Sequence, residues 1–428
     1  MPRILKLAFG KQGTEIELPD GFEYVVLDAK SAVSLDDQIG AIEHALEHPI
    51  GTPPLTELAH GKKSAAISVC DITRPAPNRK VLPPVLRRLE AAGIARQNIV
   101  ILIATGLHRP ATPAEIREIV GEEVARDYRV ENHDARELSQ HRYLGTSAAG
   151  TPAYIDERFA GADLRLSLGF IEPHLMAGYS GGRKLVVPGL AAQETIKVIH
   201  SPRFMREPLA VEGSIEENPL HRELVEIAGM AGHQFIVDVA LSRDRGIAAV
   251  FAGNPVQAHR KGVEFVSHVL LQKLKEPVDA VITTGAGYPL DLTYYQCIKG
   301  ITAASHVVRN GGRILVVGAC SEGCGGPEFS RLLGEYRDPG EFLKAIEGTP
   351  VTVDQWQLEK LALVATRAHV FYCVPGLAED LRASLWGPAF DRVDEAVAAT
   401  LAGLPAGSRV AVIPEGPYIL AKVLAQAA

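Results

Sequence analysis

Three short apolar segments, separated by segments with a helical pattern, most constrain the fold of this chain. They span residues 65–70, 99–104 and 164–170, and helical segments at 84–92 and 113–120 follow the first two. Apolar runs without polar alternation are typical of parallel strands buried on both faces of a sheet. This alternation predicts an α/β fold, a largely parallel sheet with flanking helices. Further strands are predicted at 4–9, 15–18, 235–241 and 248–251, and further helices at 35–47, 193–199 and 254–269.

The same rhythm restarts in the second half of the chain, after a polar segment at 272–277 that we interpret as a linker. Strands are predicted at 278–284, 313–318, 370–374 and 410–414, and helices at 296–309 and 418–427. The length of 428 residues is enough for two or three domains. We therefore predict an N-terminal α/β domain over 1–270 and a C-terminal α/β domain over 271–428, with the active site in the cleft between them.

The composition excludes several classes of function. With 46% hydrophobic and 22% charged residues it is ordinary for a soluble globular protein. The net charge of −7, without a basic stripe, gives no electrostatic basis for binding nucleic acid. No apolar run approaches the roughly 18 residues of a membrane span, and the N-terminus lacks a signal-peptide core. Five cysteines, an odd and sparse set, indicate a reducing compartment, so we predict a cytoplasmic protein without membrane or nucleic-acid partners.

Polar and charged side chains follow each of the three apolar segments in the first half. Asp71, Thr73 and Arg74 follow the first segment, His108 follows the second, and His174 follows the third. In open α/β sheets, ligands bind beyond the carboxyl ends of the strands. We therefore expect these side chains to converge on one edge of the sheet.

His108 and His174 are the candidates for general acid and base, because imidazole exchanges protons near neutral pH. Two histidines from different strands could flank a substrate on opposite faces, as an enzyme acting on both enantiomers requires. Asp71 could orient a histidine, and Arg74 has the rigid fork that grips a carboxylate. The alternatives are structural: histidines that cap strand ends, and Asp71 as a turn residue.

The stretch 172–200 combines glycines with a loop lysine. Its order is Gly178-Tyr179-Ser180-Gly181-Gly182-Arg183-Lys184, then Pro188-Gly189, then His200. It is not a Walker loop, because Leu185 stands where Ser or Thr would be needed. Lys184 could carry a charge to a phosphate or act as a nucleophile. His200 could ligate a metal, but no second ligand stands one turn away, so from spacing alone a helix-end histidine is the simpler interpretation.

Four residues of the second half are candidates for binding a substrate. Tyr295, Gln296 and Lys299 lie at the start of a predicted helix and could hold a carboxylate or hydroxyl group. Trp356 could line a pocket. The alternatives are a solvated helix face for Lys299 and a packing aromatic for Trp356.

Taken together, these motifs resemble the nickel-pincer lactate racemase family. The resemblance runs from near residue 65 to near residue 360. It rests on Asp71-x-Thr73-Arg74-Pro75, Thr105-Gly106-x-His108-Arg109, Glu172-Pro173-His174, the block from Gly178 to Lys184, Pro188-Gly189, His200, Tyr295-Gln296-x-x-Lys299 and Asp354-Gln355-Trp356-Gln357.

The resemblance implies a nickel-pincer nucleotide cofactor, the pyridinium-3-thioamide-5-thiocarboxylic acid mononucleotide with Ni(II). It implies that Lys184 holds this cofactor covalently and that His200 is the fourth nickel ligand, the cofactor supplying the others. Square-planar coordination of this kind suits nickel(II). Enzymes that assemble the cofactor are expected as maturation partners. The other residues expected at the cofactor are Gly178, Tyr179, Ser180, Gly181, Gly182 and Pro188, of which the glycines are assigned to its phosphate from backbone chemistry alone.

The implied activity is that of an isomerase: racemisation of a 2-hydroxy acid by proton-coupled hydride transfer through a 2-keto acid. One of His108 and His174 takes the hydroxyl proton, and the other returns a proton after the opposite face is presented. By the resemblance, Asp71 orients His108. Arg74 and Lys299 hold the substrate carboxylate, with help from Tyr295 and Gln296. An apolar wall of Leu107, Leu175, Met176 and Leu292 favours a short substrate such as lactate.

Two other classes of function stay open on the residues alone. One is a metal-dependent hydrolase or lyase built on His108, His174 and His200. The other is a non-catalytic protein that binds hydroxy acids or nucleotides.

Overall fold

The computed structural model describes residues 3–28 and 30–424. Contacts within it divide the chain into two compact units. Unit 1 comprises Met1–Lys30, His200–Pro208 and Leu270–Ala428, and unit 2 comprises Ser31–Ile199 and Leu209–Val269. One limit between the units falls at the boundary expected near residue 270. The sequence pattern gave no sign that the N-terminal segment and His200–Pro208 join unit 1.

Unit 2 is built on a six-stranded sheet in the order β13-β12-β9-β4-β5-β6. Its strands are β13 (Ile247–Gly253), β12 (Phe235–Leu241), β9 (Leu164–Phe170), β4 (Ala65–Cys70), β5 (Ile99–Ala104) and β6 (Arg129–Asn132). All neighbouring strands are parallel except β12 and β13, which are antiparallel. Every residue of β4 is buried, as its apolar run predicts for a central strand.

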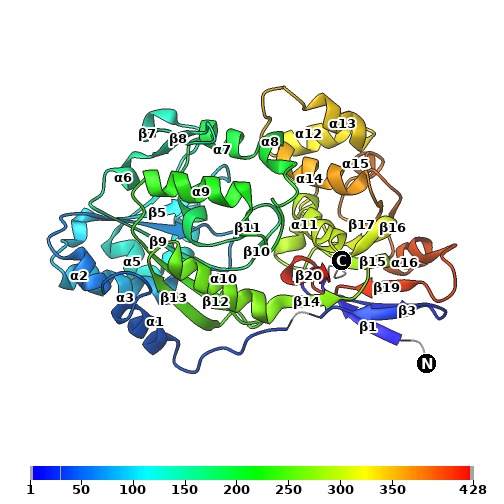
Figure 1. Cartoon of the computed structure of the whole chain (residues 1–428), viewed down its shortest axis with the longest axis horizontal. Helices are drawn as coiled ribbons and strands as arrows, with labels where there is room; N and C mark the ends of the chain where they lie inside the picture. Colours follow the sequence, from blue (N-terminus) through cyan, green and yellow to red (C-terminus); the bar gives the residue numbers. More distant parts are fainter. Residues whose placement is uncertain (1–2, 29, 425–428) are drawn as a thin grey trace. The chain divides into compact units, whose positions relative to one another are not determined.

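Helices flank this sheet. They are α1 (Gln38–Glu47), α2 (Leu55–Ala59), α3 (Asn78–Ala91), α4 (Pro113–Val120), α5 (Glu122–Asp127), α6 (Glu157–Ala160), α7 (Gln193–Ile199), α9 (Pro219–Met230) and α10 (Gln257–Leu270). In Figure 1, α1, α2 and α3 lie together, and they share one apolar core with the strands. The start of α4 follows from its sequence: Thr112 and Glu115 form a reciprocal capping box, and Pro113 occupies the first turn.

Unit 1 is built on a second six-stranded sheet, in the order β18-β17-β16-β15-β19-β3. Its strands are β18 (Ala389–Phe390), β17 (His369–Cys373), β16 (Val308–Val317), β15 (Val278–Thr284), β19 (Arg409–Val412) and β3 (Glu23–Val26). All neighbours in this sheet are parallel. The predicted fold class, an α/β protein with two largely parallel sheets, is therefore confirmed.

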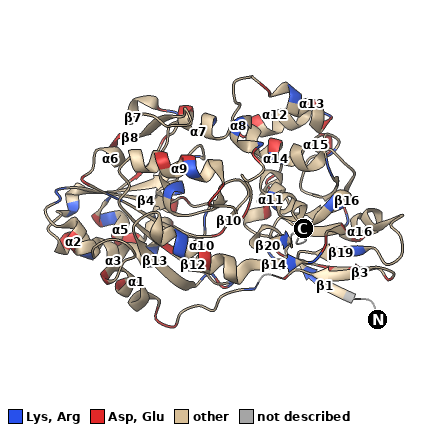
Figure 2. Ribbon diagram, viewed as in Figure 1, with Lys and Arg blue, Asp and Glu red and all other residues tan. Residues whose placement is uncertain are grey.

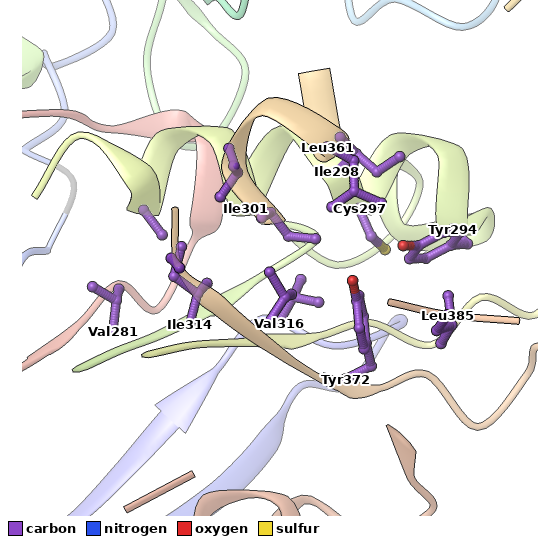
Figure 3. Close-up of a cluster of buried hydrophobic side chains, with 14 of the residues drawn as sticks. Val281, Tyr294, Cys297, Ile298, Ile301, Ile314, Val316, Leu361, Tyr372 and Leu385 are labelled. Carbon is purple, nitrogen blue, oxygen red and sulfur yellow. The ribbon is translucent and has the colours of Figure 1, made fainter. Parts of the chain in front are cut away.

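The core of unit 1 lies between its sheet and two helices, α11 and α14. The helices of this unit are α8 (Pro202–Met205), α11 (Tyr294–Ser305), α12 (Pro327–Glu335), α13 (Pro339–Ala345), α14 (Gln355–Ala365), α15 (Glu379–Arg382) and α16 (Val393–Leu401). Figure 3 shows Cys297, Ile298 and Ile301 of α11 packed over side chains of β15 and β16. A separate apolar cluster contains residues of α16, of the sheet, and of the hairpin formed by β1 (Arg3–Leu7) and β2 (Thr14–Leu18).

Two predictions for the ends of unit 1 are wrong. The segment interpreted as a linker contains β14 (Leu271–Leu274), and the predicted C-terminal helix is replaced by β20 (Leu420–Val423), which pairs with β14 in parallel. Residues 425–428 of that predicted helix lie outside the described residues. The remaining elements are β7 (His141–Thr146), β8 (Pro152–Asp156), β10 (Pro173–His174), β11 (Gly178–Tyr179), and the short 3-10 turns η1 (Arg96–Asn98), η2 (Leu138–Gln140), η3 (Gly182–Leu185), η4 (Leu290–Leu292) and η5 (Gly416–Tyr418).

Charged residues are distributed through both units. Figure 2 shows acidic and basic positions interspersed along the helices and loops. Among the described residues, no helix combines the length and hydropathy that crossing a membrane requires.

Candidate active site

The loops that follow β4 and β5 bring Asp71 and His108 into contact. The Nδ1 atom of His108 lies 2.7 Å from Oδ2 of Asp71, and the Thr73 hydroxyl donates to Oδ1 at 2.7 Å. An ionised carboxylate can only accept hydrogen bonds, so we assign the hydrogen to Nδ1 of His108. The Nε2 atom of His108 is then left with its lone pair, ready to accept a proton.

The surroundings of Asp71 keep it ionised. Burial alone would raise its pKa, because the side chain is only 5% exposed. The hydrogen bond from His108, the charge of Arg74 and the hydrogen bond from Thr73 outweigh burial and hold the pKa of Asp71 below its ordinary value. The ionised Asp71 therefore accepts hydrogen bonds from both His108 and Thr73.

His174 has the opposite arrangement at its ring. It lies in the short hairpin formed by β10 and β11. The backbone N–H groups of Met176 and Ala177 donate to its Nδ1 atom, at 3.4 Å and 3.2 Å. We therefore assign the hydrogen of the neutral ring to Nε2. At Nε2, His108 offers a lone pair and His174 offers an N–H group.

The buried side chain of Arg183 forms hydrogen bonds with the backbone of the loop that leads to Lys184. The Arg183 guanidinium is 3% exposed and lies 2.7 Å from Nε2 of His259. Burial lowers the pKa of Arg183 to about 9, so it remains charged at neutral pH. It donates hydrogen bonds to four carbonyl oxygens of the preceding loop, those of Ala177, Tyr179, Ser180 and Gly181. This arrangement fixes the backbone from which the Lys184 side chain projects.

Polar residues at the centres of three neighbouring strands support the same loop from below. The hydroxyl of Ser68 in β4 donates to the Leu185 carbonyl at 2.7 Å, and that of Ser167 in β9 donates to the Gly182 carbonyl at 3.4 Å. Ser68 and Ser167 are direct partners in the sheet. Asp238 of β12 is also fully buried. Buried polar residues of three neighbouring strands therefore lie next to the loop of η3, which carries Lys184.

Asp238 lies directly beneath two glycines of the loop. A Cβ atom on Gly181 would stand 2.6 Å from Oδ2 of Asp238, and Gly181 has a φ of +79°, so this position requires glycine. Burial raises the pKa of Asp238 to about 7, against the opposing effects of the Gly182 amide and the charge of Arg183. Neither carboxylate oxygen has a hydrogen-bond partner of standard geometry among the described residues, so the Gly182 amide acts on Asp238 by proximity.

Replacing Asp238 by asparagine is expected to flatten the pH dependence of stability. The unfolded chain loses this proton near the ordinary pKa of 3.8, and the folded protein loses it near about 7. Between these values the folded state binds more protons, so the free energy of unfolding contributed by Asp238 falls as the pH rises. Urea unfolding across this range should show that fall in wild type and lose it in Asp238→Asn. The exposed residue Asp36 provides the control, since Asp36→Asn should keep the wild-type slope.

Pro188 and Gly189 join the lysine loop to the loop that carries His108. The Gly106 amide donates to the Gly189 carbonyl at 3.1 Å, and the Gly189 amide donates to the Lys184 carbonyl at 3.1 Å. Unit 2 thus links Lys184 by backbone hydrogen bonds to the segment that contains His108.

In unit 1, Tyr295 and Trp356 are in contact at the first turns of α11 and α14. The indole Nε1 of Trp356 donates to the Tyr295 hydroxyl at 3.2 Å, and the Gln357 side chain donates to the Tyr295 carbonyl at 2.9 Å. Gln296 and Lys299 are half-buried on α11. The Oε1 atom of Gln296 is buried and has no hydrogen-bond partner among the described residues.

His200 belongs to unit 1, although the helix α7 that precedes it belongs to unit 2. Its ring lies 4.6 Å from that of Trp356, at an angle of 40°. The described residues contain no group of three or more His, Cys, Asp or Glu able to hold a metal. The described residues therefore do not surround His200 with a preformed cluster of such ligands, and a single imidazole donor is compatible with a metal carried by a cofactor that has its own ligands.

Sequence reasoning missed the residues that support the lysine loop. Arg183 stands in the loop pattern without an assigned role, and Ser68, Ser167 and Asp238 lie inside segments predicted as strands. A polar residue at the centre of a strand buried on both faces must find a partner, and that requirement was the available signal. This signal could not identify the hydrogen-bond partners of these residues, because η3 lies far along the chain from β4.

Two family models and two curated relatives match this chain over most of its length. Residues 9–213 match the family described as the lactate racemase N-terminal domain, and residues 273–421 match the lactate racemase C-terminal domain. The lactate racemase of Thermoanaerobacterium thermosaccharolyticum is 35% identical over 98% of this chain and 99% of its own length. That of Lactiplantibacillus plantarum is 36% identical over 89% of this chain and 90% of its own.

Solved structures agree with the sequence comparison. The lactate racemase apoprotein from T. thermosaccharolyticum superposes with a TM-score of 0.91 at 32% identity, over 98% of this chain and all of that one. A Thermotoga maritima protein, at 17% identity and a TM-score of 0.69 over 92% of this chain and all of that one, shares the fold. The family resemblance drawn from the motifs is confirmed, and the chain belongs to the lactate racemase family.

Proposed function

We propose that this protein is a racemase of short 2-hydroxy acids, with lactate as its first candidate substrate. The isomerase class follows from its family. The observation that carries the proposal is the 2.7 Å contact between buried Asp71 and Nδ1 of His108, which leaves Nε2 as a base. That contact occurs in a chain matched over nearly its whole length by two lactate racemases.

The two histidines exchange the hydroxyl proton of the substrate. The Nε2 atom of His108 accepts it from one enantiomer, and Asp71 stabilises the imidazolium that results. His174 presents an N–H group that can hydrogen-bond the oxygen of the resulting 2-keto acid. A neutral ring carries only one hydrogen, so His174 must start this direction as an imidazolium in order to return a proton to the hydroxyl oxygen. In the opposite direction His108 starts as the imidazolium and His174 is the neutral base.

The substrate carboxylate is held by cations and by donors near them. Arg74 stands three residues after Asp71, and Lys299 lies one turn after Tyr295 on α11. The buried, unpartnered Oε1 of Gln296 supports a polar ligand at this position, since a buried oxygen without a partner is costly. We propose that the residues of unit 1 and unit 2 serve the same reaction.

The residues present fit the nickel-pincer nucleotide. Lys184 would hold it covalently, His200 would supply the protein's nickel ligand, and the backbone of Gly178, Tyr179, Ser180, Gly181, Gly182 and Pro188 would surround it. When bound, the group supplies a reversible acceptor for the Cα hydrogen as hydride. Cofactor-assembly enzymes are required as maturation partners. All five cysteines are unpaired thiols, which supports the proposed cytoplasmic location.

A chiral assay tests the proposed function. Protein produced together with cofactor-assembly enzymes is incubated with pure D-lactate or pure L-lactate, and the product is resolved by chiral chromatography. Both reactions should converge on equal amounts of the two enantiomers, and protein produced alone should be inactive. Binding without turnover by loaded protein would favour a binding protein. Activity restored by bare metal to protein without an adduct would favour a metal hydrolase or lyase.

A further inference from the structure

The segment His200–Pro208 contacts helix α14 through residues that have no role in the proposed reaction. In Figure 1 its helix α8 lies beside α14, and the two pack together. Phe204 and Met205 of α8 are buried. The segment begins with His200, so whatever holds it on α14 also holds that imidazole.

Two adjacent charged residues of α14 reach this segment. The Nζ atom of Lys360 donates to the Met205 carbonyl at 2.8 Å. The Nε atom of Arg206 donates to Oε1 of Glu359 at 2.8 Å, and its Nη2 atom donates to the Leu343 carbonyl of α13 at 2.5 Å. A more exposed carboxylate, Glu347, lies 4.0 Å from Nη1 of Arg206.

Both residues of α14 are buried, which makes their charges costly unless they are paired. Glu359 is 0% exposed and Lys360 is 6% exposed. Burial raises the pKa of Glu359, and the hydrogen bond and charge of Arg206 oppose the rise. Removing one member of such a pair leaves an uncompensated buried charge, so the Arg206–Glu359 contact is strongly coupled to the position of the segment.

The aromatic ring that contacts His200 lies on the same face of α14. Trp356 precedes Glu359 by three residues and Lys360 by four, and residues at these spacings share a helix face. The His200 ring stands 4.6 Å from the Trp356 ring. One face of α14 therefore both contacts the imidazole and fastens the chain that follows it.

We propose that Arg206, Glu359 and Lys360 are positioning residues that fix the His200 imidazole for metal binding. This proposal rests on the proposed function, in which His200 is the nickel ligand. A metal-ligating side chain that is already ordered in the folded protein binds its metal more tightly, because no further conformational entropy is lost on binding. In this proposal Glu359 and Lys360 act on His200 through the segment that follows it.

The first test uses protein without cofactor. Hydrogen exchange of the amides in 200–208, followed by mass spectrometry, should be at least about tenfold faster in Arg206→Met than in wild type. Arg203→Met is the matched control, because Arg203 lies on the same segment and stacks on Phe204 outside the Arg206–Glu359 pair. The chain has two tryptophans, so in a Trp386→Phe background acrylamide quenching reports Trp356 alone, and it should increase in Arg206→Met.

The second test measures nickel retention by loaded protein challenged with a chelator. Loss of nickel should be roughly tenfold faster in Arg206→Met and in Glu359→Met, in line with other residues that orient metal ligands. Glu359→Gln keeps a hydrogen-bond acceptor for Arg206 and should lose nickel at a rate between these variants and wild type. Lys184 should carry the same adduct in every variant.

The proposal would be overturned if the amides of 200–208 exchanged at the wild-type rate in Arg206→Met. It would also be overturned if both Arg206→Met and Glu359→Met lost nickel at the wild-type rate. If wild-type protein carries no nickel at all, the proposed function fails, and the hydrogen exchange of 200–208 then decides on the positioning contacts alone. The two failures are therefore distinguishable.

Discussion

Replacing His108 by glutamine is expected to slow racemisation of lactate by about 10²–10⁴-fold in both directions. Glutamine keeps much of the side-chain volume but cannot take up a proton. In the proposed mechanism one histidine accepts the hydroxyl proton and the other returns one, so both directions depend on His108. The rates are measured from each pure enantiomer with fully loaded protein.

Asp71→Asn is the companion variant. It keeps the shape of Asp71 but removes the charge that stabilises imidazolium, and an amide that donates to Nδ1 would favour the tautomer with hydrogen on Nε2. Activity should fall by a comparable factor. The exposed His60 provides the control, since His60→Gln should keep wild-type rates. A His108→Gln enzyme with a rate within about twofold of wild type would remove His108 from the mechanism.

Replacing Lys184 by arginine is expected to abolish both the cofactor adduct and the activity. Arginine keeps the positive charge, so a lysine that serves only as a point charge to a phosphate would be partly replaced. Arginine could not replace a lysine that is bonded covalently to the cofactor, because guanidinium is a poor nucleophile at neutral pH. Activity should fall to that of protein produced without the assembly enzymes.

Peptide mass spectrometry decides between these two roles of Lys184. Wild-type protein should carry added mass on the peptide containing Lys184, and Lys184→Arg should carry none anywhere. Lys197 of α7 is the matched control, and Lys197→Arg should keep both adduct and activity. An active enzyme with unmodified Lys184 would contradict covalent attachment.

The main strands were predictable from sequence because their apolar runs leave little choice. β4, β5, β9 and β15 have the predicted limits, since a run buried on both faces ends where polar residues begin. The pairing of β14 with β20 was not predictable in this way. Each is four residues long, and its partner lies about 150 residues away along the chain, so neither has a local signal. The same holds for β3, which joins the far edge of the second sheet through β19.

The candidate site was partly predictable for the same reason. The contact of Asp71 with His108 follows from parallel neighbouring strands, whose carboxyl ends lie side by side. The contacts that hold the loop of Lys184 on the sheet could not be predicted in this way. The sequence does not show that Asp238 of β12 lies next to Gly181. The contacts of Glu359 and Lys360 with His200–Pro208 are equally non-local. Charged residues on an otherwise apolar helix suggest burial with partners but do not identify them.

The measurement that tests the account most directly follows the hydrogen at Cα of lactate. Loaded protein is incubated in ordinary water with D-lactate deuterated at Cα, and the L-lactate formed is analysed by mass spectrometry. If the histidines move only the hydroxyl proton while the Cα hydrogen leaves and returns as hydride, the product should retain its deuterium. Replacement of most of that deuterium by solvent hydrogen would contradict the account, because it would mean that a proton is removed from Cα.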